Sequence, residues 1–111
     1  IVKSAELIGP VLAVVPFEDE EEAVSLANDT VYGLAAGIWT GDVTRAIRIA
    51  ERIQAGTIYV NNYFNSATQS PVGGYKQSGY GRENGIEGML SFMQTKSVWL
   101  STQPGTPNPF G

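Results

Sequence analysis

The feature that most constrains this chain is a strand-like run that ends abruptly in a polar, glycine-rich segment. The run Thr57–Val60 combines β-branched and aromatic side chains, which suit a pleated and largely buried strand. The pattern breaks at Asn61 and Asn62, and Pro71 and six glycines follow before or at residue 88. Loops held by regular elements commonly carry binding residues. The segment after this strand is therefore the first candidate for a site.

Composition limits the classes of protein that need to be considered. A chain of 111 residues forms one domain or a piece of one, and its 42% hydrophobic content is that of a globular protein. The net charge of -4 argues against a broad nucleic-acid interface, so no nucleic-acid partner is expected. The sequence contains no Cys and no His. Disulfides, thiol chemistry and a histidine general base are therefore excluded within these residues.

The ends of the chain carry no targeting signal. Residues 1–8 are too short and too polar for a signal peptide, and no apolar run is long enough for a membrane span. We therefore expect no membrane partner and a cytoplasmic location. The first residue is Ile1 rather than Met, and we expect the chain to begin within a longer protein.

The order of apolar runs predicts an α/β fold. Strands are expected at residues 11–17, 34–40 and 57–60, alternating with helices at residues 19–28 and 43–55. Gly33 and Gly56 are expected to follow the two helices as stops. The order β-α-β-α-β implies parallel strands joined by right-handed crossovers.

The second half of the chain is expected to continue with less regular structure. A long loop at residues 61–82 leads to a helix at residues 83–93, which would bury Ile86, Met89, Leu90 and Met93. Residues 97–102 alternate apolar and polar side chains, as a half-buried strand does. The tail from residue 103 is rich in proline and glycine and is predicted to be a linker or a poorly ordered end.

Two charged clusters admit both a structural and a functional interpretation. Acidic residues 19–22 favour a capped helix start, with a cation site as the alternative. Arg45, Arg48 and Arg52 share one side of a helix and could hold a phosphate. Because Asp42 and Glu51 are near enough to pair with them, a solvated face is the favoured interpretation.

The glycine-rich segment fits neither of two common phosphate-binding motifs. A P-loop needs Lys and Ser or Thr after its second glycine, but Gly79 is followed by Tyr80. A dinucleotide fingerprint would need a third glycine at the position of Asn84. Tight turns and close backbone packing remain the simple explanation for each glycine taken alone.

Two motifs together resemble a known family. Residues 6–11 read ELIGPV and residues 70–83 read SPVGGYKQSGYGRE. Their order and spacing are similar to the C-terminal part of the NAD(P)-dependent aldehyde dehydrogenase family, over residues 5–100. The resemblance implies a fragment of the catalytic α/β domain at residues 1–95, an oligomerisation strand at residues 96–103 and a flexible tail at residues 104–111.

The resemblance implies a wall of the aldehyde tunnel in the loop after residue 60. By position, the pocket-lining candidates are Phe64, Ser66 and Val72, with Asn62 as a weaker one. Many relatives carry aromatic side chains where this chain has Ser66 and Val72. The small side chains predict a wider tunnel that accepts aldehydes bulkier or more polar than acetaldehyde.

The resemblance also implies a cofactor contact. In the family, a glutamate at the position of Glu6 binds the ribose hydroxyls of the nicotinamide half of NAD or NADP. A carboxylate suits a vicinal diol because it accepts two hydrogen bonds. Ile8 stands where relatives have a Phe beside the nicotinamide, so it can pack against the ring edge but cannot stack on it.

The reaction that the resemblance implies is oxidation of an aldehyde to a carboxylic acid. A Cys thiolate attacks the carbonyl, hydride passes to NAD(P)+, and an activated water hydrolyses the thioester. The catalytic Cys lies outside these residues, so the chain alone is expected to be inactive. The strand Ser97–Thr102, with Trp99 on its second face, is expected to pair with a neighbouring subunit of a homodimer or tetramer.

Three alternatives stay open at this point. Residues 97–102 could be an internal edge strand of the same fold. The chain could be a non-catalytic α/β binding or interaction module, in which case an initiator Met close to Ile1 is expected. It could also be a free-standing phosphate- or nucleotide-binding domain, in which case the isolated chain would bind nucleotide.

Overall fold

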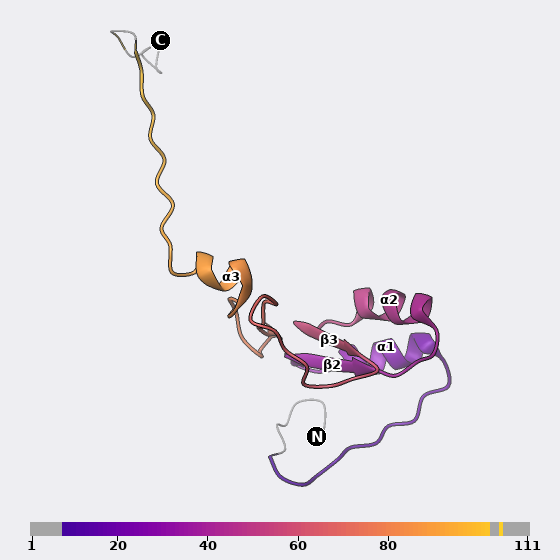
Figure 1. Ribbon diagram of the computed structural model, residues 1–111. Helices are drawn as coiled ribbons and strands as arrows, with labels where there is room; N and C mark the ends of the chain where they lie inside the picture. Colours follow the sequence, from indigo (N-terminus) through magenta and orange to yellow (C-terminus); the bar gives the residue numbers. More distant parts are fainter. Residues whose placement is uncertain (1–7, 103–104, 106–111) are drawn as a thin grey trace.

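The computed structural model describes residues 8–102 and residue 105. Two helices and two parallel strands form its central unit, and a third helix lies beyond it along the chain (Figure 1). The elements in order are α1 (Glu20–Asn28), β1 (Tyr32–Gly33), β2 (Ala35–Ile38), α2 (Val43–Arg52), β3 (Thr57–Val60), β4 (Tyr75–Lys76) and α3 (Gly85–Leu90).

The centre of the fold is the unit β2-α2-β3. Its two strands are parallel, with Ala35 opposite Thr57 and Ile38 opposite Val60. This arrangement confirms the parallel pairing that the apolar runs predict for the second and third expected strands. Each buried apolar residue of the described chain belongs to this unit or to α1 beside it. They are Val24, Ala46 and Ala55.

Helix α2 begins at the predicted residue 43, and helix α1 begins one residue after the predicted start at residue 19. The side chain of Asp19 accepts a hydrogen bond from the backbone N–H of Glu22, and that of Asp42 accepts one from Arg45. These bonds satisfy amides that have no partner within the helix. The acidic first turn of α1 also lies at the positive end of the helix dipole.

The predicted role of Gly56 as a helix stop is wrong. Helix α2 ends at Arg52, with Ile53 as its capping residue. Gly56 instead donates its N–H to the carbonyl of Gly33, at 3.1 Å, just before β3. A Cβ at this position would lie 1.6 Å from the carbonyl oxygen of Gly73. The glycine is therefore required by a close approach of two backbone segments.

Gly33 is likewise part of a strand rather than a helix stop. It lies in β1, which pairs with β4 in an antiparallel two-residue ladder that the sequence pattern did not predict. The ammonium of Lys76 in β4 donates to the carbonyl oxygens of Asn28 at 2.7 Å and Thr30 at 3.1 Å. This contact ties the glycine-rich segment to the end of α1, where carbonyls lack helical partners.

The predicted first strand, at residues 11–17, is not formed. The segment has no strand pairing among the described residues, and its apolar side chains are exposed: Leu12 by 85% and Val14 by 81%. A strand exists only when a neighbouring chain segment satisfies its N–H and C=O groups. The expected five-element β-α-β-α-β sheet is therefore reduced to one parallel pair.

The C-terminal elements also differ from expectation. Helix α3 is shorter than the predicted helix, and its expected inner stripe is exposed, with Ile86 at 68% and Met89 at 61%. Residues 97–102 form no strand, since no other described segment lies beside them to complete a ladder. The expected tail at residues 104–111 lies outside the described residues except for Gly105.

Much of the apolar surface is left uncovered in this chain. The Cα radius of gyration is 21.7 Å, whereas a compact chain of this length would have about 13 Å. Figure 1 shows the segment after α3 leading away from the sheet and its helices. Within the described part of the chain, no helix is both long and apolar enough to span a membrane.

Candidate functional site

The carboxyl ends of β2 and β3 lie at the same edge of the parallel pair. In open α/β sheets this edge is where ligands bind. Asn61 follows β3 and joins the two ends: its N–H donates to the carbonyl of Ile38 at 2.8 Å. Its side chain accepts from the N–H of Thr40 at 2.9 Å and donates to the carbonyl of Thr40 at 2.8 Å. One residue, Asn61, therefore makes three hydrogen bonds that hold the two strand ends together at this edge.

Four aromatic rings gather at and beside this edge. The ring of Tyr63 lies 6.4 Å from that of Trp39, 4.9 Å from that of Tyr59 and 5.0 Å from that of Phe64, measured between centroids. The absence of a side chain on Gly37 makes room, since a Cβ there would lie 2.5 Å from the Trp39 ring. Sequence reasoning singled out only Phe64. The signal it missed is that Trp39 and Tyr63 follow neighbouring parallel strands.

The predicted pocket residues fall into two places. Asn62, Phe64 and Ser66 lie on one exposed stretch directly after β3, and Phe64 joins the aromatic rings there with 86% of its surface exposed. Asn62 donates its side-chain N–H to the carbonyl of Val60 at 3.1 Å. Val72 lies at the far end of the loop and is half-buried. The structure thus brings Phe64 into a cluster but shows no contact between it and Val72.

The far end of the loop is fixed by main-chain contacts. Val72 and Glu83 exchange two hydrogen bonds, at 2.8 and 2.7 Å, in an antiparallel bridge. The Arg82 guanidinium lies over the Tyr75 ring, 5.5 Å from its centroid, and donates to the carbonyl of Gly74 at 3.1 Å. The glycine-rich segment therefore folds back on itself. Gly73 and Gly74 serve close packing, since a Cβ on either would meet atoms of the same segment, whereas Gly79 and Gly81 take positive φ values of 126° and 78°.

The two predicted cofactor residues lie near the start of the chain. Glu6 falls outside the described residues. Ile8 is described and is 92% exposed, so its side chain has almost no packing within this chain. Their roles remain predictions.

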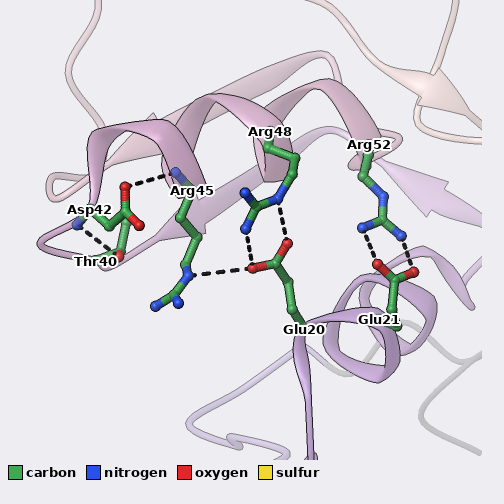
Figure 2. Close-up of polar contacts among 7 residues, drawn as sticks. All are labelled: Glu20, Glu21, Thr40, Asp42, Arg45, Arg48 and Arg52. Carbon is green, nitrogen blue, oxygen red and sulfur yellow. Dashed lines mark hydrogen bonds and ion pairs between the residues drawn. The ribbon is translucent and has the colours of Figure 1, made fainter.

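The three arginines of α2 face the first turn of α1 (Figure 2). Arg48 forms a two-bond pair with Glu20, at 2.8 and 2.7 Å, and Arg52 forms one with Glu21, at 2.7 and 2.5 Å. Arg45 lies 3.4 Å from Glu20. The acidic partners are those of α1 rather than the predicted Asp42 and Glu51. Because all three guanidinium groups already face carboxylates, the arrangement favours a helix-to-helix contact over a phosphate site.

These pairs shift the pKa values of the groups involved. The hydrogen bonds from Arg48 lower the pKa of Glu20 below its ordinary value, and those from Arg52 do the same for Glu21. The pKa of Asp42 is lowered mainly by the N–H of Arg45, which its side chain accepts at the start of α2. In each case the hydrogen bonds stabilise the charged form of the carboxylate, and the pKa falls as a result.

The alternative of a cation site at the acidic turn finds no support. Within residues 8–102, no group of three or more His, Cys, Asp or Glu side chains is arranged to hold a metal ion. Two of the turn's carboxylates face arginines, and Glu22 accepts the N–H of Glu18 at 2.8 Å. The acidic turn therefore caps the helix and accepts the hydrogen bonds of the arginines of α2.

An open pocket of about 560 Å3 lies between α1, β2 and α2. Its lining is mostly apolar, with Val24, Ile38 and Ile49 among the residues, and includes charged residues such as Glu20 and Arg45. None of the four predicted pocket residues lines it. This cavity is therefore distinct from the exposed loop that carries Phe64.

Comparison with known proteins gives a consistent result. The sequence model of the aldehyde dehydrogenase family matches residues 2–98 of this chain. A betaine aldehyde dehydrogenase of Bacillus subtilis (strain 168) is 45% identical over 105 residues, which are 95% of this chain and 21% of the relative. The NADP/NAD-dependent aldehyde dehydrogenase PuuC of Escherichia coli (strain K12) is 46% identical over 98 residues, 88% of this chain and 20% of the relative.

A solved structure shows the same backbone arrangement. It is a double mutant of the betaine aldehyde dehydrogenase of Staphylococcus aureus in complex with NAD+. The match has a TM-score of 0.89 at 42% identity and covers 97% of this chain and 22% of that chain. The chain therefore spans about one fifth of the length of the relatives that it matches.

Proposed function

Because this chain belongs to the aldehyde dehydrogenase family, we propose that the protein of which it is part oxidises an aldehyde to a carboxylic acid with NAD or NADP. The observation that carries the proposal is the family match over residues 2–98, together with two aldehyde dehydrogenases that are 45% and 46% identical to this chain. The NAD+ complex of one structural neighbour and the NADP/NAD name of PuuC support the choice of cofactor.

In this proposal the chain supplies one wall of the aldehyde tunnel. Phe64, Ser66 and Val72 line the wall, with Asn62 beside them. The exposure of Phe64 and its place at the carboxyl edge of the sheet support this role, because a wall residue needs an open face toward the substrate. The nucleophilic Cys would come from outside these residues, since the chain contains none. The chain alone would therefore position substrate without converting it.

The proposal gives two residues to the nicotinamide cofactor, which accepts the hydride when bound. Glu6 would hold the ribose hydroxyls through its two carboxylate oxygens. Ile8 would pack against the edge of the nicotinamide ring. Its 92% exposure supports a contact with something other than this chain. The proposal gives Gly73 and Gly74 no phosphate contact, because a Cβ on either would already meet atoms of their own loop.

The proposed substrate is an aldehyde bulkier or more polar than acetaldehyde. Ser66 and Val72 are small where many relatives are aromatic, so the tunnel beside them would be wide. Betaine aldehyde is a suitable probe because it is bulky and cationic, and because relatives carry that name. Its quaternary ammonium group would also be attracted to an aromatic face such as that of Phe64.

The proposal includes pairing of residues 97–102 with a neighbouring subunit of a homodimer or tetramer. In this single chain Val98 is 81% exposed, Trp99 96% and Leu100 86%. Apolar side chains exposed along one segment favour an interface.

The test is aldehyde-dependent formation of reduced cofactor by the complete protein. We expect turnover of betaine aldehyde and of acetaldehyde with NAD or NADP, with a higher kcat/KM for the bulkier aldehyde. The 111-residue chain assayed alone should give no turnover. Absence of turnover by the complete protein with any aldehyde would favour the non-catalytic binding module, and nucleotide binding by the isolated chain would favour the third alternative.

A further inference from the structure

Asn61 combines a backbone constraint with a side-chain constraint. Its φ is 53°, in the left-handed region that asparagine tolerates better than most residues. Its carboxamide pairs with both peptide groups of Thr40: the oxygen accepts from the N–H at 2.9 Å and the nitrogen donates to the C=O at 2.8 Å. The side chain thus extends the β2–β3 ladder by one pair after the backbone has turned away.

The turn at Asn61 sets the direction of the predicted tunnel wall. The backbone N–H of Asn61 still belongs to the sheet, since it donates to Ile38. The next residues leave the sheet, and Phe64 three residues later again has a positive φ, of 59°. The hydrogen bond to Ile38 therefore fixes the position at which the loop begins, and the φ of Asn61 fixes the direction in which the loop leaves the sheet.

The same contact also aligns two rings. Thr40 directly follows Trp39, and Asn61 lies two residues before Tyr63, whose ring is stacked with that of Trp39 at 6.4 Å and 22°. Tyr63 in turn lies against Phe64, 5.0 Å away and edge-on at 85°. A change in the spacing of Asn61 and Thr40 would therefore move the rings that support Phe64.

We infer that Asn61 is a positioning residue that determines aldehyde selectivity: by clamping Thr40, it fixes the loop on which Phe64 and Ser66 face the substrate. The inference rests on the proposed tunnel role of that loop. Asn61 itself touches neither substrate nor cofactor in this scheme. Asparagine suits this position because it tolerates a positive φ and because its short side chain carries both a hydrogen-bond donor and an acceptor that reach Thr40.

Two substitutions separate the backbone effect from the clamp. Asn61→Gly keeps the positive φ at no steric cost but removes both side-chain hydrogen bonds. Asn61→Asp keeps one acceptor for the Thr40 N–H and sets a carboxylate oxygen against the Thr40 carbonyl. The matched control is Thr40→Ala, because the clamp uses the main chain of residue 40 and survives loss of its side chain.

The experiment uses the complete protein and first measures turnover of betaine aldehyde and acetaldehyde by the wild type, which tests the proposed function by itself. In Asn61→Gly we expect the ratio of the two kcat/KM values to change about tenfold or more, because a displacement of about 1 Å in a positioned group can cost up to about a hundredfold. The KM for the cofactor should stay unchanged. Thr40→Ala should keep the wild-type ratio.

Amide hydrogen exchange of residues 62–66 is measured in parallel, because it does not depend on activity. We expect faster exchange in Asn61→Gly, a smaller increase in Asn61→Asp, and wild-type exchange in Thr40→Ala. If Asn61→Gly fails to fold, Asn61→Asp alone must show the altered ratio and exchange. A wild-type aldehyde ratio together with wild-type exchange in the Asn61 variants would overturn the inference while leaving the proposed function standing.

Discussion

The carbonyl oxygen of Gly73 occupies the space in which a side chain on Gly56 would begin. A Cβ at residue 56 would lie 1.6 Å from that oxygen and 2.8 Å from the carbonyl carbon of the same residue. The contact joins the start of β3 to the glycine-rich segment seventeen residues later in the chain. It holds the far end of the predicted tunnel loop against the sheet that carries its near end.

This contact predicts that Gly56→Ala is strongly destabilising in the complete protein. Neither partner can yield, because both are backbone. The expected loss is about 3 kcal/mol, the upper end of what overpacking costs. Chemical denaturation measures it. Gly41→Ala is the matched control, since a Cβ there meets no atom within 4 Å. Equal stability of the two variants would contradict the close approach.

The ion pairs between α1 and α2 predict a pH dependence. The hydrogen bonds from Arg48 lower the pKa of Glu20 below its ordinary value of 4.5 in the folded protein. A lowered carboxyl pKa contributes stability that is present above the unfolded value and is lost as pH falls through the folded one. The melting temperature should therefore decline in acid, beginning near pH 4.5.

The variant Glu20→Gln isolates this contribution. It should lower the melting temperature of the complete protein at neutral pH and flatten its decline in acid. High salt should reduce the difference from wild type, because Arg48 is solvent-exposed and Glu20 partly so, and ions screen such a pair. Glu51→Gln is the control, since it removes a carboxylate from α2 outside the pairs shown in Figure 2. An acid profile of Glu20→Gln identical to that of wild type would refute the assignment.

The proposed tunnel width predicts the effect of restoring a ring. Ser66→Phe should lower kcat/KM for betaine aldehyde about tenfold relative to acetaldehyde, because a pocket that loses space discriminates by size. Steady-state kinetics with both aldehydes measures the ratio. Ser70→Phe makes the same chemical change in the loop but outside the proposed pocket, and should leave the ratio unchanged. The tunnel assignment fails if Ser70→Phe alters selectivity and Ser66→Phe does not.

Local signals in the sequence predicted local structure well. The starts of α1 and α2 were predicted to within one residue and the TIYV run predicted β3, because helix-start signals and strand composition act within a few residues. The role of Gly56 was missed because the segment that approaches it lies seventeen residues away. The β1–β4 ladder, two residues long, leaves no periodic pattern to detect.

Local sequence signals could not predict elements that need a pairing partner elsewhere in the protein. Residues 11–17 and 97–102 have the composition of strands, but a strand also needs a neighbour to complete its hydrogen bonds, and no described residue provides one. In the candidate site, Phe64 was proposed by position from the family resemblance. Its aromatic neighbours Trp39 and Tyr63 required knowledge of which strands lie side by side.

The most direct test of the tunnel assignment is a crystal structure of the complete protein with an aldehyde or its acid product bound. The account predicts atoms of Phe64, Ser66 and Val72 within about 4.5 Å of the ligand. A cysteine sulfur should lie on the opposite side of the same tunnel. A ligand bound elsewhere, or one that faces no cysteine, would contradict it.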